Sequence, residues 1–96
     1  MIEDALKLTP DEHRKRLIDT SYSYLMDHRP ASTAPAESRG RFVDAFLTAF
    51  NDGDPTVQRL ATVAFLVNTE LMEHTLNGAQ LKPRLESHIS FPEKQD

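Results

Sequence analysis

The chain has 96 residues, 39% of them hydrophobic, with a formal net charge of −4 and no cysteine. This length fits one folded domain, and the acidic balance argues against a general binder of nucleic acid or anionic membranes. The lack of cysteine excludes disulfide scaffolds, zinc–thiolate sites and thiol nucleophiles.

The N-terminal segment, MIEDALKL, has neither the basic region nor the apolar region of a secretion signal. No apolar run approaches the roughly 20 residues that cross a bilayer. We therefore expect a cytoplasmic protein without a membrane segment. We also expect a single helical domain over residues 1–91 and a frayed tail over residues 92–96.

The first long helix begins at a capping box, the sequence Thr9-Pro10-Asp11-Glu12. In this motif the side chains of Thr9 and Glu12 each accept a hydrogen bond from the other residue's backbone N–H, and Pro10 suits the first helical position. The helix is expected to end near Asp27. One group of side chains should face the core: Leu17, Ile18, Tyr22, Tyr24, Leu25 and Met26. Another group should face water: His13, Lys15, Arg16, Asp19 and Asp27.

Four consecutive residues of this helix, His13 to Arg16, form a basic cluster that could indicate contact with nucleic acid. The simpler interpretation is a solvated helix face, on which Asp11 and Glu12 pair with Lys15 and Arg16 one turn away. We favour the solvated face.

Residues 28–40, HRPASTAPAESRG, predict a loop that is either mobile or crosses the bundle. The next helix should begin between Pro35 and Ser38 and end at residues 51–53. Three aromatic residues recur every fourth position of this helix and predict a stripe packed in the core: Phe42, Phe46 and Phe50.

The most apolar stretch of the chain predicts a central helix from Pro55 to Asn77, about six turns long. Asp54 can cap its first turn, and Asn77-Gly78 offers a left-handed residue for its end. Its apolar arc covers roughly 220° of the helical wheel, so this helix should pack among several others.

Two polar residues of the central helix fall inside this apolar arc, and one leucine falls outside it. Phe65 belongs to the arc, whereas Leu66 lies on the far side among polar residues. Asn68 and Thr75 fall within the arc, and a buried Asn68 would need a hydrogen-bond partner.

A last short helix is expected to begin at Pro83 and to end at Phe91-Pro92. The pattern as a whole predicts an all-α fold, a small helical bundle of three long helices plus one or two short ones, packed around the central apolar helix.

The sequence contains no glycine-rich phosphate loop, nucleophile elbow or zinc-protease motif. Glu70 and His74 are four residues apart and share a helix face, but two ligands are fewer than a metal site needs. The other acidic residues fall on polar faces or at termini. We therefore predict that the protein is not an enzyme and has no catalytic residue, metal site or cofactor.

A helix-turn-helix DNA-binding regulator, formed by residues 42–60, is the main alternative. The stretch Thr56-Val57-Gln58-Arg59-Leu60 resembles the start of recognition helices in repressor families, which implies that Gln58 and Arg59 would read base edges. The acidic turn before it and the apolar continuation of the helix count against this alternative. Residues 54–61 also resemble part of a HEAT-type repeat, but no second copy is visible in the sequence.

The function predicted from these observations is a small non-catalytic regulator, such as an inhibitor, an antitoxin-like protein or an adaptor, that occupies the surface of a partner protein. Acidic faces would steer it to a basic surface on that partner. The residues expected to bind the partner are Leu66, Glu70, Glu73, Arg39 and Arg41. A homodimer is a further alternative, because an apolar arc of roughly 220° is wide for a small monomer to cover.

Overall fold

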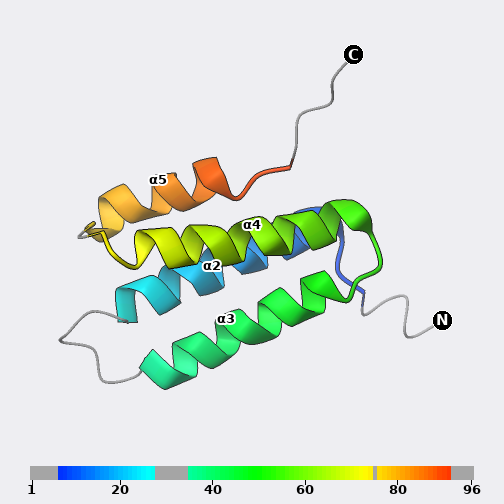
Figure 1. Ribbon diagram of the computed structural model, residues 1–96, viewed down its shortest axis with the longest axis horizontal. Coiled ribbons are helices and arrows are strands. Elements are labelled where there is room, and N and C mark those ends of the chain that lie inside the picture. The colour runs from blue at the N-terminus through cyan, green and yellow to red at the C-terminus, as the bar shows by residue number, and fades with distance from the viewer. Residues whose placement is uncertain (1–6, 28–34, 75, 92–96) are drawn as a thin grey trace, which may run out of the picture.

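The computed structural model describes residues 7–27, 35–74 and 76–91, and within these ranges it contains four helices and no strand. The helices are α2 (Pro10–Asp27), α3 (Pro35–Phe50), α4 (Pro55–Leu71) and α5 (Gly78–His88). Figure 1 shows α4 between α3 and α5, with α2 behind it. The predicted all-α fold is confirmed, since three long helices and a shorter one form a small bundle.

Two helices hold this bundle together, because α2 and α4 each pack against all the other described helices. α3 and α5 lie on opposite sides of α4 and do not contact each other (Figure 1). All four helices contribute to one apolar core: Leu17, Ile18, Leu25, Phe42, Ala45, Ala49, Val57, Leu60, Ala61, Ala64, Val67, Leu71, Leu81 and Leu85, with Ile89 just after α5. Within the described residues, none of the helices is both long and apolar enough to cross a membrane.

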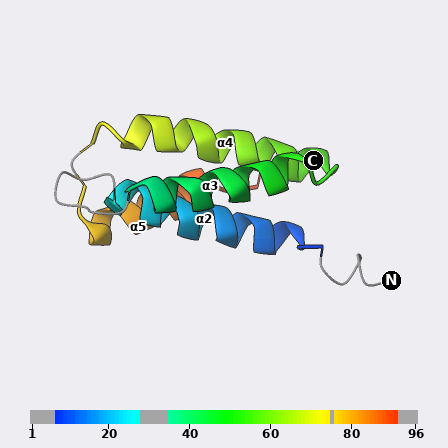
Figure 2. The same ribbon diagram turned by 90° about the horizontal axis from the view of Figure 1, so that it is seen from below.

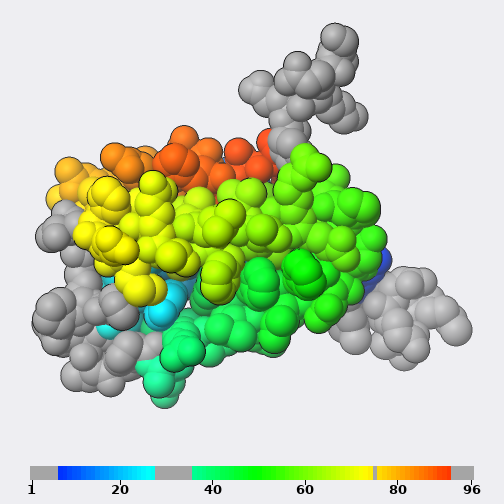
Figure 3. Space-filling model, in the orientation of Figure 1, coloured from blue at the N-terminus to red at the C-terminus, as the bar shows by residue number. Residues whose placement is uncertain are grey.

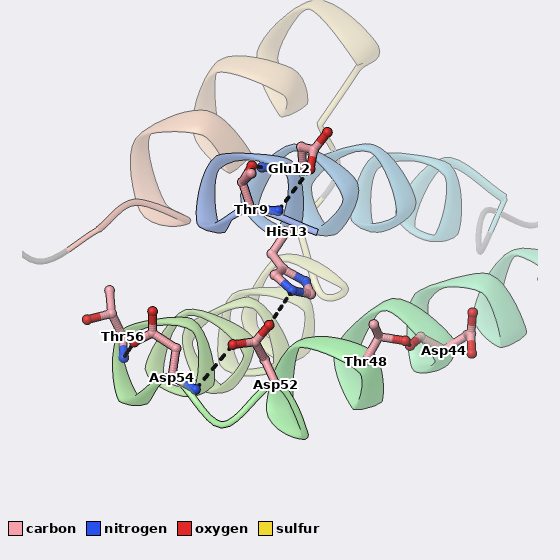
Figure 4. Close-up of polar contacts among 8 residues, drawn as sticks. All are labelled: Thr9, Glu12, His13, Asp44, Thr48, Asp52, Asp54 and Thr56. Atoms are coloured by element: carbon pink, nitrogen blue, oxygen red, sulfur yellow. Dashed lines mark hydrogen bonds and ion pairs between the residues drawn. The ribbon is translucent and has the colours of Figure 1, made fainter. Parts of the chain in front are cut away.

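Local signals determine where α2 and α4 begin, as predicted. The Thr9 N–H donates to Glu12 Oε1 over 2.8 Å, and the Glu12 N–H donates to Thr9 Oγ1 over 3.2 Å, which completes the capping box (Figure 4). Before α4, Gly53 turns the chain with a φ of +98°, a conformation that favours glycine. Asp54 Oδ1 then accepts a hydrogen bond of 2.9 Å from the Thr56 N–H and caps α4.

The predicted end of α4 is wrong. The helix ends at Leu71 after 17 residues, and Asn77 is the N-cap of α5 rather than a residue of α4. Asn77 Oδ1 accepts from the Gln80 N–H over 2.9 Å, and the Asn77 N–H donates to Gln80 Oε1 over 3.2 Å. Asn is favoured both at an N-cap and at a left-handed helix end, and here the Gln three residues later completes an N-terminal capping box.

The predicted start of the last helix is also wrong, because α5 begins at Gly78 and Pro83 lies inside it. Gly78 is not in the left-handed conformation. A Cβ atom on this residue would instead lie 2.6 Å from Tyr22 Oη of α2, so the Tyr22 side chain would have to shift to admit any other residue here.

The predicted loop over residues 28–40 is shorter than expected, because residues 35–40 form the first turns of α3. α3 thus begins at Pro35, within the predicted range, and ends at Phe50, just before the predicted turn. Residues 28–34, Thr75 and the predicted tail over residues 92–96 lie outside the described residues.

Candidate protein-binding face

Five large apolar side chains are exposed on α3 and α4. Their exposed fractions are 41% for Val43, 46% for Leu47, 46% for Phe50, 51% for Phe65 and 61% for Leu66. The three residues on α3 are spaced four and three positions apart, so they share one side of that helix. Phe46 connects the two helices, since its ring centroid lies 5.6 Å from those of both Phe50 and Phe65. These five exposed residues are called the α3–α4 face below.

The α3–α4 face lies on two neighbouring helices that run antiparallel. Figures 1 and 2 show α3 and α4 side by side, and Figure 3 shows their surfaces adjoining on the side of the molecule away from α2. With about 150–200 Å² for each large side chain, the exposed fractions correspond to roughly 400 Å² of apolar surface. The largest apolar patch on a typical monomer is about 300–600 Å², and such patches are often functional.

A hollow of about 240 Å³ opens beside the face, where α3 and α4 meet the C-terminal half of α2. Phe42, Val43, Phe65 and Met72 form much of its lining, and Arg39 is its charged residue. Because two of these side chains, Val43 and Phe65, also belong to the α3–α4 face, the hollow and the face form one continuous surface.

Asn68 is buried beside this hollow, as its place in the apolar arc predicted. Its Nδ2 donates to Ser21 Oγ over 2.7 Å and to the Ala64 carbonyl over 2.8 Å, so the expected buried partners exist. Its Oδ1 has no hydrogen-bond donor among the described residues. The wall of the hollow is mostly apolar, and this unpaired acceptor is buried behind it.

Three of the residues predicted to bind a partner lie on or just after α4, and all three are exposed. Leu66 and Glu70 are four residues apart and share one side of the helix, and Glu73 lies in the turn after its end. Leu66 belongs to the α3–α4 face, so the two carboxylates extend the face along α4 toward the C-terminal end of that helix.

The two predicted arginines do not lie together. Arg39 lines the hollow, whereas Arg41 is two residues further on and so points about 200° away around α3. Arg41 shares its side of α3 with Asp44, whose carboxylate pairs with Arg16 of α2 at 2.5 Å. The structure thus brings Arg39, but not Arg41, next to the α3–α4 face.

The basic cluster His13 to Arg16 is not the solvated face that we expected. The Arg14 Nε and Nη2 atoms donate to the carbonyls of Ile89 and Glu86 over 2.7 and 2.8 Å, and so satisfy the end of α5. Arg16 pairs with Asp44 of α3, and Lys15 is exposed. Because these side chains contact different elements, they do not form a single basic patch that could bind nucleic acid.

The prediction that His13 faces water is wrong, because this residue is buried. Its Nε2 lies 3.0 Å from Asp52 Oδ2, and only 3% and 6% of the two side chains are exposed (Figure 4). Burial acts to raise the pKa of Asp52, but hydrogen bonds from His13 and from the Asp54 N–H, with the charges of Lys7 and His13, together lower it. The pair joins the start of α2 to the turn between α3 and α4.

This His–Asp pair has the composition of a catalytic dyad and links α2 to the turn between α3 and α4. A general base must reach a substrate proton, and both side chains here are almost completely enclosed. Across the residues that the structure describes, no group of three or more His, Asp or Glu side chains is placed to hold a metal ion. Glu70 and His74 are both exposed on the last part of α4 and the turn after it.

The residues of the helix-turn-helix alternative lie at the start of α4, where Gln58 is half-buried and Arg59 is exposed. In that motif the two helices cross at about 90–120°, whereas α3 and α4 lie nearly antiparallel in Figures 1 and 2. The carboxylates of Asp52 and Asp54 also lie in the turn between the helices, where phosphates would approach. This geometry does not favour DNA binding by α3 and α4.

No protein-family model matches the chain, and comparisons with curated proteins and with solved structures gave no match. The function is therefore inferred from the surface alone.

Proposed function

We propose that this protein is a small non-catalytic regulator that binds a partner protein through the α3–α4 face. The observation that carries this proposal is the exposure of five large apolar side chains on two adjacent helices, which the Phe46–Phe65 ring contact joins. A cytoplasmic location and the roles of inhibitor, antitoxin-like protein or adaptor belong to the same proposal.

The size of the face supports docking of moderate strength. Burial of roughly 400 Å² of apolar surface would contribute about 10 kcal/mol at 25 cal/mol per Å². Association costs an estimated 4–15 kcal/mol in lost freedom of motion, so the face alone does not ensure tight binding. The hollow can add affinity, because a volume of about 240 Å³ can receive a large apolar side chain of the partner.

The charged residues around the face support a particular kind of partner. Glu70 and Glu73 extend the face along α4, and all 15 acidic residues of the chain contribute to its net charge of −4. A basic rim on the partner would meet these carboxylates, while Arg39 would meet an acidic group near the hollow. Exposed charges of this kind raise the association rate more than the affinity.

The experiment compares four tagged proteins as baits in a lysate of the source organism, with and without nuclease: wild type, Leu66→Asp, Glu70→Lys and Arg84→Glu. Arg84 is exposed on α5, away from the face, so its reversal is the control for a change of charge. We expect one stoichiometric protein partner that resists nuclease, stays bound to Arg84→Glu and is lost from Leu66→Asp.

The proposal fails if Leu66→Asp and Glu70→Lys retain every partner that the wild type binds. Recovery of nucleic acid that is lost in Gln58→Ala and Arg59→Ala, both with unchanged circular dichroism, would instead support the helix-turn-helix alternative.

A further inference from the structure

The outer row of α4 has a pattern of charges that its own copy would complement. Arg59 and Leu66 are seven residues apart on α4 and share one side of it, and Glu73 follows seven residues later in the turn just after the helix; all three are exposed. Arg59 therefore lies about 10 Å from Leu66 along the helix axis, toward the start of α4, and the carboxylate of Glu73 lies beyond Leu66 at the other end of the helix.

A two-fold axis through Leu66 would pair these charges. In a two-fold dimer the same surface is used by both copies, and an axis across α4 makes the two α4 helices antiparallel. Leu66 then meets Leu66 of the second copy, and Arg59 of each copy lies opposite Glu73 of the other. One arrangement thus buries the most exposed large apolar side chain and forms two ion pairs.

The same two-fold axis would also bring residues of α3 from the two copies together. The contact of 5.6 Å between the rings of Phe46 and Phe65 places the last turns of α3, around Phe46, beside the part of α4 that carries Leu66. Val43 and Phe50 lie on either side of Phe46, three and four residues from it. The axis would therefore bring Val43 of each copy toward Phe50 of the other, in addition to the contact between the two Leu66 side chains.

We infer that the first occupant of the α3–α4 face is a second copy of this chain, in an antiparallel two-fold dimer centred on Leu66 with reciprocal Arg59–Glu73 ion pairs. This inference rests on the proposed use of the face for protein binding and names its partner. The roughly 400 Å² of apolar surface is about half of what each partner contributes to a stable interface, and the flanking charged and Thr side chains would supply the rest. A partner of another kind would have to compete with this dimer.

The test uses a charge exchange that only this register predicts. Arg59→Glu and Glu73→Arg each turn two attractive pairs into two repulsive pairs, and we expect the dimer dissociation constant of each variant to rise about tenfold or more. An equimolar mixture of the two variants restores both attractive pairs, so dimers should reappear only on mixing. The double variant Arg59→Glu/Glu73→Arg should dimerise like the wild type.

The measurement is sedimentation velocity on the full chain from about 1 to 500 μM, a range that covers the dissociation constant expected of a modest interface. The mass should rise from 10.9 kDa toward twice that value in the wild type and in the control Arg84→Glu. Leu66→Asp should remain monomeric throughout. Near-native circular dichroism of each variant shows that loss of the dimer is not loss of the fold.

A wild type that stays monomeric over this range overturns the inference, and so does a dimer that is indifferent to the Arg59 and Glu73 reversals. The proposed function has a different point of failure. If the wild type is monomeric but Leu66→Asp loses a captured partner, the face binds another protein and only the dimer is wrong. If the mixed variants dimerise and no other partner is lost from Leu66→Asp, the dimer is supported. The proposal that the protein regulates a different protein is then wrong.

Discussion

Replacement of Asp52 by Ala tests how far one buried polar contact holds the bundle together. The change removes the acceptor of two hydrogen bonds, one of 3.0 Å from His13 and one of 3.2 Å from the Asp54 N–H, and leaves His13 buried without its partner. A hydrogen bond to a charged group contributes about 1.5–3 kcal/mol. Part of this free energy is recovered in the variant, because water can hydrogen-bond to the donors that lose their acceptor. We therefore expect the free energy of unfolding to fall by about 2–4 kcal/mol.

For a domain of this size 1 kcal/mol corresponds to about 4–8 °C, so Tm should fall by roughly 10–25 °C in a thermal melt followed by circular dichroism. Asp44→Ala is the matched control, because the Asp44 pair with Arg16 is 69% exposed on the carboxylate side and should contribute less than about 1 kcal/mol. The reasoning is refuted if Asp52→Ala costs no more stability than Asp44→Ala.

The same contact has a predictable pH dependence. The pKa of Asp52 is lowered from its usual value of 3.8 in the folded protein, so the folded state favours the carboxylate. Its contribution is therefore present above the usual pKa and is lost as the pH falls through the folded pKa. Urea unfolding at a series of pH values should show the advantage of wild type over Asp52→Ala shrinking below about pH 4.

Three other substitutions test separate contacts. Gly78→Ala should destabilise the fold by about 1–3 kcal/mol, because its Cβ would lie 2.6 Å from Tyr22 Oη, and Tyr22→Phe should recover part of this loss in urea unfolding. Arg14→Ala should cost about 1.5–3 kcal/mol, since it removes two charged hydrogen bonds to the end of α5, and amide hydrogen exchange in α5 should quicken more than in α3. Leu66→Asp should change the free energy of unfolding by less than about 0.5 kcal/mol at a concentration where the wild type is monomeric, because Leu66 is 61% exposed; a larger loss there would mean that this side chain supports the folded monomer.

The parts of the fold that the sequence predicted correctly depend on neighbouring residues. The capping box at Thr9 and Glu12 and the cap at Asp54 need no knowledge of the rest of the chain, and both helices begin where expected. Asn77-Gly78 misled the prediction because the same pair suits the end of one helix and the start of the next. The decisive signal was Gln80, which completes a capping box with Asn77.

His13 shows why polarity alone is a poor guide to burial. It lies four residues before Leu17, and the row continues through Ser21 to Leu25, with all four residues buried. The spacing therefore indicated a core position, but the polar side chain suggested water. Its partner, Asp52, is 39 residues away, so no local pattern could reveal that this His would be satisfied inside the protein.

The candidate face was predicted only in part, for a related reason. Leu66 was identified as exposed, but Phe65 and Phe50 were assigned to the core because each lies on the apolar side of its own helix. A helical wheel shows which side of a helix is apolar, and only the packing shows how much of that side the neighbours cover. Here α2 and α5 cover much of α4, and the remaining apolar edge lies beside α3.

Each of the helices α3 and α4 has only a small apolar area that its neighbours leave uncovered. Because α3 and α4 are antiparallel neighbours, the uncovered edge of one adjoins the uncovered edge of the other, and Phe46 joins them into a single face. Scattered exposed side chains require no explanation, but a continuous face bordered by Arg59 at one end and Glu73 at the other offers a partner both an apolar centre and a fixed orientation. The same geometry that limited the prediction from sequence therefore produces the face on which the proposed binding depends.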